Sequence, residues 1–341
     1  MKRILPVLAA LLLVFLSAVP GSLAESAPDA GPTATPAPLD PFPESASDIH
    51  IKEEDGGQFV TLPIDIEQGG VKLTGFKYSP EISVYEDPSI RVEYHRVEGG
   101  RTWEVVYYFA DIIIKDPAQL RTAFATGGKK FNNNVKKPVR AISTKLNAVL
   151  AINGDFFAGY SRTAFVLRQG DVYRDTAEAG FDALLIDEDG DFHVVTREMD
   201  PPSVDKTQVD GKKVINAFQF GPALVIDGEP VADDVLLDQS HSPVYADPHL
   251  RNQRMCIMQI DKLHYMVLTC AHWGLTLPMF RNLAMYVSNY QAKTVYTLDG
   301  GNSCQIVFLG NKKNNVSKDA KEPERAVTDI IYFASAWQAG K

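Results

Sequence analysis

Residues 298–303 read Leu298-Asp299-Gly300-Gly301-Asn302-Ser303, so a carboxylate and two glycines lie between two short apolar runs. The run before them, Thr294 to Leu298, and the run after them, Gln305 to Leu309, have the length and composition of buried strands. Paired glycines can adopt positive φ and turn several backbone N–H groups toward one point, which suits an anion such as phosphate. The pattern predicts that Asp299 is held at the end of a rigid strand, beside an anion-binding turn.

A second turn of the same kind reads Asn153-Gly154-Asp155-Phe156-Phe157 and follows the apolar run from Ala148 to Ile152. Two acid-bearing glycine turns at strand ends predict the two sides of one site. The site would belong to an enzyme that acts on polar substrates, either phosphorylated or glycosidic.

The N-terminus has the pattern of a secretory signal peptide. Lys2 and Arg3 precede an almost unbroken apolar run from Ile4 to Ala18, and small residues at Ser22-Leu23-Ala24 suit a cleavage site. The run is short for a membrane-spanning helix, although an uncleaved anchor is the alternative. We therefore expect residues 1–24 to be removed and the protein to be secreted, or held in the cell envelope, with no membrane insertion after cleavage.

Residues 25–47 are rich in Ala, Pro and Ser and carry too little apolar surface to fold, so we expect an extended, disordered tether. Residues 48–341 are long enough for one large domain, in which residues 48–104 either join the main sheet or form a small N-terminal strand lobe. The formal net charge of −9 and the lack of a Lys/Arg block argue against nucleic acid and anionic membranes as partners.

The three cysteines, Cys256, Cys270 and Cys304, are an odd set without C-x-x-C spacing. They exclude a zinc ribbon and a disulfide framework, and three buried thiols are expected, with a Cys256–Cys270 bridge as the alternative.

Hairpin signals dominate the rest of the chain, which predicts an α+β fold with a large mixed or antiparallel sheet and few helices. One amphipathic helix is expected after Thr276, which is a good N-cap, with Pro278 in the first turn. A short helix is also expected from Ala118 to Ala125, capped by Asp116.

Several pieces, in this order, resemble the phosphodiester glycosidase family, whose animal member removes N-acetylglucosamine from a phosphodiester. The pieces are Tyr108-Phe109-Ala110-Asp111 with Asp116-Pro117, Ala151 to Phe157, Gly221 to Gly228, Arg254, Leu298 to Gly301, and Glu324-Arg325-Ala326-Val327. The resemblance covers about residues 105 to 335. This chain departs from the family in having Asn302 at a usual glycine, no Thr or Gly on the strand after Arg254, and an acid at position 155.

The resemblance implies catalytic roles for three acids. Asp299 would act as base or nucleophile at the anomeric carbon, or as a metal ligand, and the alternative is a turn residue that binds its own loop. Asp155 would be a catalytic acid or a turn residue. Glu324 would orient Arg325 or bind a metal, unless it belongs to a solvated charge run. No cofactor is certain, and Ca²⁺ held by loop carboxylates is the candidate.

Substrate binding is expected from the arginines and from both turns. Arg254 and Arg325 present paired donors that match phosphate oxygens, with structural ion pairs as the alternative. Asn153 could hold a sugar hydroxyl and Phe156 could stack on a sugar ring. The remaining predicted binding residues are Gly154, Gly300, Gly301, Asn302 and Ser303.

The function expected from these residues is an exported hydrolase that cleaves the glycosidic bond of a sugar-1-phosphate diester in an envelope or extracellular glycan. Two alternatives stay open: a non-catalytic glycan-binding or envelope-assembly module on the same fold, and a metal-dependent phosphodiesterase. The expectation requires the residues around positions 153, 254, 299 and 325 to converge on one cleft.

Overall fold

The computed structural model describes residues 58–59, 70–73, 83–99, 103, 105–157, 164–238, 247–271, 273–315 and 324–338. The predicted signal peptide (1–24) and tether (25–47) lie outside these residues. Among the helices of the described part, none is long and apolar enough to cross a membrane.

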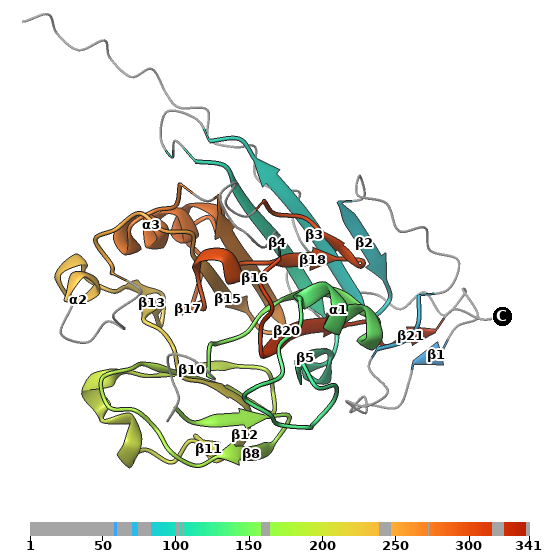
Figure 1. Ribbon diagram of the computed structural model, residues 1–341, viewed down its shortest axis with the longest axis horizontal. Helices are drawn as coiled ribbons and strands as arrows, with labels where there is room; N and C mark the ends of the chain where they lie inside the picture. Colours follow the sequence, from blue (N-terminus) through green and yellow to red (C-terminus); the bar gives the residue numbers. More distant parts are fainter. Residues whose placement is uncertain are drawn as a thin grey trace, which may run out of the picture. The chain divides into compact units, whose positions relative to one another are not determined.

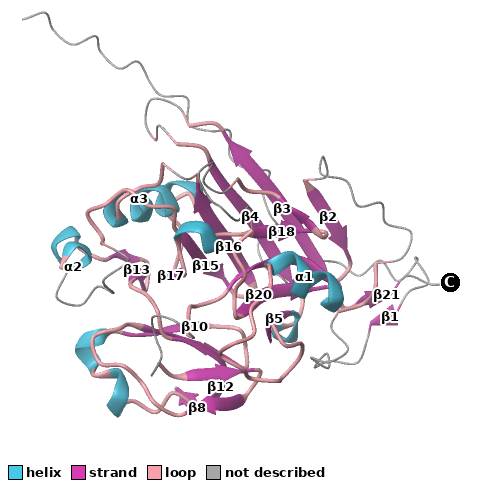
Figure 2. Cartoon of the chain, in the orientation of Figure 1, coloured by secondary structure: helices cyan, strands magenta, loops and turns pink. Residues whose placement is uncertain are grey.

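The largest sheet has eight strands in the order β14-β13-β17-β15-β16-β4-β3-β2. Its strands are β2 (Val84–Asp87), β3 (Ile90–Val97), β4 (Tyr107–Ile114), β13 (Ala223–Ile226), β14 (Glu229–Pro230), β15 (Met255–Asp261), β16 (His264–Cys270) and β17 (Thr294–Leu298). All its pairings in the described residues are antiparallel, as the hairpin signals predict. The expected strand-rich α+β architecture is therefore confirmed, and β2 and β3, within residues 84–97, join the main sheet (Figures 1 and 2).

A five-stranded sheet in the order β19-β18-β6-β20-β5 carries the predicted Asn153-Gly154-Asp155 turn at the end of its middle strand, β6. Its strands are β5 (Leu120–Phe124), β6 (Ala148–Asn153), β18 (Ile306–Phe308), β19 (Asn311–Lys312) and β20 (Asp329–Ala334). Tyr265 on β16 and Phe333 on β20 bring their ring centroids within 5.7 Å, so this sheet packs on the eight-stranded one.

A third sheet has the order β10-β9-β12-β7-β8, with β11 paired to β12, and a two-stranded ribbon joins β1 to β21. These strands are β1 (Gln58–Phe59), β7 (Val166–Arg168), β8 (Asp171–Arg174), β9 (Ala183–Asp187), β10 (Phe192–Val195), β11 (Gln208–Val209), β12 (Lys212–Phe218) and β21 (Trp337–Gln338).

Helices are few. The α-helices of the described residues are α1 (Val139–Ser143), α2 (Asp233–Leu237) and α3 (Leu277–Val287). The 3-10 turns are η3 (Pro117–Gln119), η4 (Thr144–Leu146), η5 (Arg197–Met199), η6 (Pro201–Ser203) and η8 (Gly301–Ser303). Helix α3 is the helix predicted after Thr276, whose hydroxyl accepts the Met279 N–H at 3.4 Å.

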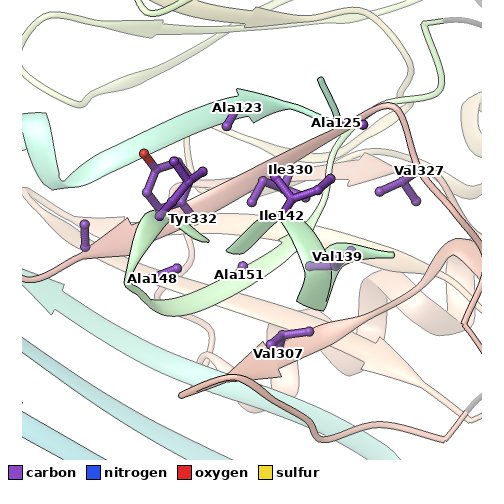
Figure 3. Packing of buried hydrophobic residues seen from close by; sticks show 12 residues of the cluster. Ala123, Ala125, Val139, Ile142, Ala148, Ala151, Val307, Val327, Ile330 and Tyr332 are labelled. Atoms are coloured by element: carbon purple, nitrogen blue, oxygen red, sulfur yellow. The ribbon is translucent and has the colours of Figure 1, made fainter. Parts of the chain in front are cut away.

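The short helix α1, which the sequence did not predict, covers one face of the five-stranded sheet (Figure 3). Val139 and Ile142 of α1 pack there against Ala151, Ile330 and Tyr332 from the middle of the sheet. Five helical residues are too few to be stable alone, so this packing holds the helix.

The helix expected from Ala118 to Ala125 is wrong. Asp116 does cap a turn, accepting the Ala118 N–H at 2.8 Å, but the turn ends at Gln119 and strand β5 follows. All five residues of β5 are buried and pair with β20, and this pairing overrides the local helix propensity. The cysteine prediction is confirmed, because Cys256, Cys270 and Cys304 are all free and buried.

Tyr296 on β17 ties the eight-stranded sheet to the third sheet. Its hydroxyl accepts the Phe220 N–H at 2.8 Å and lies 2.9 Å from the Asp182 carbonyl and 3.1 Å from the Phe218 carbonyl. The side chain is fully buried, so water cannot replace these hydrogen bonds.

We predict that Tyr296→Phe lowers the free energy of unfolding by about 1–3 kcal/mol, because it leaves buried backbone groups unpaired. Urea denaturation measures the change. Tyr290→Phe is the control, since Tyr290 is 69% exposed. Equal stability of the two variants would contradict the role given to the Tyr296 hydroxyl.

Candidate functional site

A cavity of about 370 Å³ opens where β6, β17 and the start of β20 come together. It is lined by Lys136, Gly154, Asp155, Phe156, Asp299, Ser303, Arg325, Ala326, Val327 and Thr328. The structure therefore brings the two predicted turns and Arg325 to one place, although they are far apart in the sequence.

Asn153 fastens the two turns to each other. Its side-chain amide donates to the Asp299 carbonyl at 2.8 Å and the Gly154 carbonyl at 3.2 Å, and its oxygen accepts the Gln305 N–H at 3.2 Å. The residue is fully buried and does not line the cavity. As placed, it positions the turns rather than holding a sugar hydroxyl.

Two glycines permit close approaches that any larger residue would block. A Cβ on Gly154 would lie 2.5 Å from Asp329 Oδ1, and a Cβ on Gly300 would lie 2.8 Å from the Gln253 carbonyl oxygen. Gly301 has φ +59, where side chains are disfavoured. Asn302, at the position of a usual family glycine, has no positive φ and lies in η8, so this departure causes no backbone strain.

The turn after β17 is not the open cluster of N–H groups that its glycines suggested. The Asp299 N–H donates to the Gly154 carbonyl at 3.4 Å, the Gly301 N–H to the Gln253 carbonyl at 2.7 Å, and the Ser303 N–H to the Gly300 carbonyl at 3.2 Å. These three groups fix the loop and are not available to an anion, which leaves the side chains on the cavity as its main candidate partners.

Asp299 lies on the cavity wall directly after β17 and is 9% exposed. Burial raises the pKa of its carboxyl to about 6, although the Ser303 hydroxyl, the Arg325 charge and the Gly300 N–H act in the opposite direction. Such a group ionises close to neutral pH, which suits a catalytic base.

Asp155, on the opposite wall, is held by a buried arginine that the sequence analysis did not single out. Arg168 Nη2 contacts Asp155 Oδ1 at 2.9 Å and Asp329 Oδ2 at 2.9 Å, while its Nε donates to the same Asp329 oxygen at 3.0 Å. The guanidinium stacks on Phe218 at 4.1 Å from the ring centroid. Asp155 and Asp329 are thus joined through one cation.

Two cations and an aromatic ring line the rest of the cavity. Arg325 is exposed and its Nη1 lies 3.5 Å from the Ser303 hydroxyl. Lys136 places its ammonium 5.0 Å from the centroid of the half-buried Phe156 ring. Phe157, in contrast, is fully buried against Phe124 and belongs to the core.

Arg254 does not line the cavity. Its Nε donates to the Leu275 carbonyl at 2.8 Å, and its Nη2 to the Leu250 and Asp247 carbonyls at 3.0 and 3.1 Å. Burial lowers its pKa to about 10. Positions 153, 254, 299 and 325 are expected to converge on one cleft. Arg254 instead fixes the neighbouring loop, and its guanidinium does not face the cavity.

Glu324 also lies outside the cavity. Its carboxylate is 3.8 Å from Arg140 Nε, and both residues line a separate surface hollow of about 570 Å³ beside α1. The catalytic role expected for Glu324 therefore has no geometric support at the Asp299 cavity.

Sequence reasoning missed Lys136, Arg168 and Asp329. A usable signal existed for two of them, because Arg168 ends the apolar run Phe165-Val166-Leu167 and Asp329 begins the apolar strand β20. A charge inside a buried stretch is almost always paired, so such residues are expected to have partners. For Lys136 the sequence holds no comparable signal.

No group of three or more His, Cys, Asp or Glu residues in the described ranges is arranged to hold a metal ion. Calcium binding by loop carboxylates stays a prediction.

A strand-rich α+β fold with a buried acid and two cations on one cavity defines a class of protein, a candidate hydrolase of anionic substrates. Comparison with known sequences narrows this class. The profile of the phosphodiester glycosidase family matches residues 146–334, which is more than half of the chain. The chain belongs to the phosphodiester glycosidase family. No protein of curated function matches it.

Three solved structures resemble the fold. The zebrafish N-acetylglucosamine-1-phosphodiester alpha-N-acetylglucosaminidase catalytic domain, auto-inhibited by its pro-peptide, has a TM-score of 0.57 at 12% identity and covers 79% of this chain and 87% of its own. A hypothetical Synechocystis protein has a TM-score of 0.45 at 13% identity, covering 72% and 62%. A putative exported protein from Burkholderia pseudomallei K96243 has a TM-score of 0.42 at 10% identity, covering 68% and 74%. Membership of the family indicates a glycosidase-like hydrolase, and the zebrafish structure is a likeness of fold.

We predict that Gly154→Ala destabilises the protein by about 1–3 kcal/mol, because the added methyl group would overlap Asp329 Oδ1. The same substitution should cost much less in an Asp329→Ala background, where the overlapping carboxylate is gone. Denaturation of the four members of this cycle measures the coupling. A cost that is equal in both backgrounds would show that the close approach is not the reason for the glycine.

Proposed function

We propose that the protein is an exported phosphodiester glycosidase that hydrolyses the sugar C1–O bond of a sugar-1-phosphate diester in an envelope or extracellular glycan. The observation that carries the proposal is the placement of Asp299 on one cavity with Arg325 and Lys136, in a chain of this family. The pattern of residues 1–24 supports export.

Arg325 and Lys136 are suited to bind the phosphate. A guanidinium stays charged at any working pH and pairs with two phosphate oxygens, and an ammonium adds a point charge. The formal net charge of −9 disfavours anions over the whole surface, so these two cations supply the local attraction. Phe156 offers an apolar ring face for the sugar.

Cleavage of the sugar C1–O bond needs little help from a general acid, because the phosphate monoester that leaves is already a stable anion. It demands a carboxylate near the anomeric carbon, to activate water or to attack directly, and charge stabilisation on the phosphate. In this proposal Asp299 is that carboxylate. Asp155, ion-paired with Arg168, adds negative charge near the cationic sugar of the transition state.

The experiment that tests the function is incubation of the purified protein with a panel of sugar-1-phosphate diesters, starting with N-acetylglucosamine-1-phosphate diesters, and measurement of free sugar. We expect release of the sugar and of a phosphate monoester. In ¹⁸O-labelled water the label should enter the sugar, whereas a phosphodiesterase would place it in the phosphate. Binding of the diesters without any turnover would favour the non-catalytic module.

We predict that Asp299→Asn reduces kcat by at least about 100-fold without unfolding the protein, on the scale of an essential base. In the unchanged protein, activity should fall as the pH drops below about 6, because the carboxyl is then protonated. Asp261→Asn is a control, since Asp261 lies at a hairpin end and pairs with Lys293. Full activity of Asp299→Asn would remove this residue from the chemistry.

A further inference from the structure

The buried cluster behind the cavity contains more acids than cations. Asp155 and Asp329 share Arg168, and both of the Arg168 bonds to Asp329 go to the same oxygen, Oδ2. Asp329 is fully buried, and within the described residues its Oδ1 makes no hydrogen bond. A Cβ built on Gly154 would lie 2.5 Å from that oxygen, so Gly154 packs against it and has no side chain to offer as a donor.

We propose that Asp329 is a positioning residue that carries a proton in the working enzyme, so that Arg168 holds Asp155 as the ionised carboxylate at the cavity. The inference rests on the proposed function for its catalytic consequence. Asp329 does not line the cavity, so it acts on the substrate only through Arg168 and Asp155.

The hydrogen bonding favours the neutral form of Asp329. An ionised carboxylate would leave a charged oxygen buried without a donor, which costs far more than a neutral hydroxyl in the same place. In the acid form, the carbonyl oxygen Oδ2 accepts both Arg168 bonds and Oδ1 carries the proton. Burial raises the pKa of this carboxyl to about 8, and the charges of Asp155 and Asp299 add to the shift while Arg168 opposes it.

The charge balance of the site leads to the same conclusion. The charged groups facing Asp329 and its partners are Asp155 after β6, Arg168 on β7, Arg174 on β8 and Asp299 after β17. With Asp329 neutral, the two acids Asp155 and Asp299 balance the two arginines Arg168 and Arg174, and the cations Lys136 and Arg325 are left to attract a phosphodiester. With Asp329 ionised, the cluster gains a buried negative charge that repels the substrate.

The first test is the pH dependence of kcat/KM for a diester that the enzyme hydrolyses. In the unchanged protein, activity at pH 9 should be about a tenth of that at pH 7, because a group of pKa about 8 is then about nine-tenths ionised. Asp329→Asn keeps the shape and the neutral charge, so this ratio should rise to about 1. An alkaline fall that is unchanged in Asp329→Asn overturns the proposal.

A second test needs no activity and so separates this proposal from the proposed function. Infrared difference spectra between the unchanged protein and Asp329→Asn at pH 7 should show the C=O stretch of a protonated carboxylic acid in the unchanged protein alone. Stability gives a further readout. Because the pKa of this carboxyl is raised on folding, its contribution to the free energy of unfolding falls as the pH rises from about 4 to about 8. The stability of Asp329→Asn relative to the unchanged protein should therefore rise over the same pH range. Absence of both effects contradicts a protonated Asp329.

Substitution of Arg121 is a matched control for substitution of Arg168. Both are almost completely buried, but Arg121 bonds the Tyr332 hydroxyl and the Ala118 carbonyl, which do not line the cavity. Lysine cannot reproduce the three contacts that Arg168 makes with Asp155 and Asp329, so Arg168→Lys should lower kcat by about 10–100-fold, with KM changed little. Arg121→Lys should lower stability and leave kcat within about threefold. Equal losses of kcat in the two variants would show that Arg168 is only structural.

Discussion

The site depends on one buried guanidinium that joins two strands of different sheets. Arg168 ends β7 of the third sheet, and its partners Asp155 and Asp329 follow β6 and begin β20 of the five-stranded sheet. Such a cluster is costly to bury and is weak evidence for stability in itself. Its value here is geometric, because it fixes the wall of the cavity on which Asp155 lies.

The other wall is fixed by neutral hydrogen bonds and close packing against backbone carbonyls rather than by charge. The Asn153 side-chain amide donates to the Asp299 carbonyl. Gly300 has no side chain, so the turn packs closely against the Gln253 carbonyl. Asp299 is buried on this wall, and burial raises its pKa, while Arg325 is exposed. A rigid, buried acid beside an exposed cation is an arrangement suited to an anionic substrate.

The sequence predicted the turn at Asp299, helix α3 and the hairpin-rich sheet because each is encoded by local spacing. It did not predict strand β5, where pairing with β20 overrides a helical pattern, or the outward placement of Glu324. Arg254 was misplaced because the sequence cannot distinguish a guanidinium that binds phosphate from one that binds backbone carbonyls. Arg168 and Asp329 acquire their importance only when three distant segments meet.

A crystal structure of the Asp299→Asn variant with an unhydrolysed sugar-1-phosphate diester would test this arrangement most directly. We expect the phosphate within hydrogen-bonding distance of Arg325 and the anomeric carbon facing residue 299. A diester bound elsewhere on the chain, with the cavity between the two turns left empty, would contradict it.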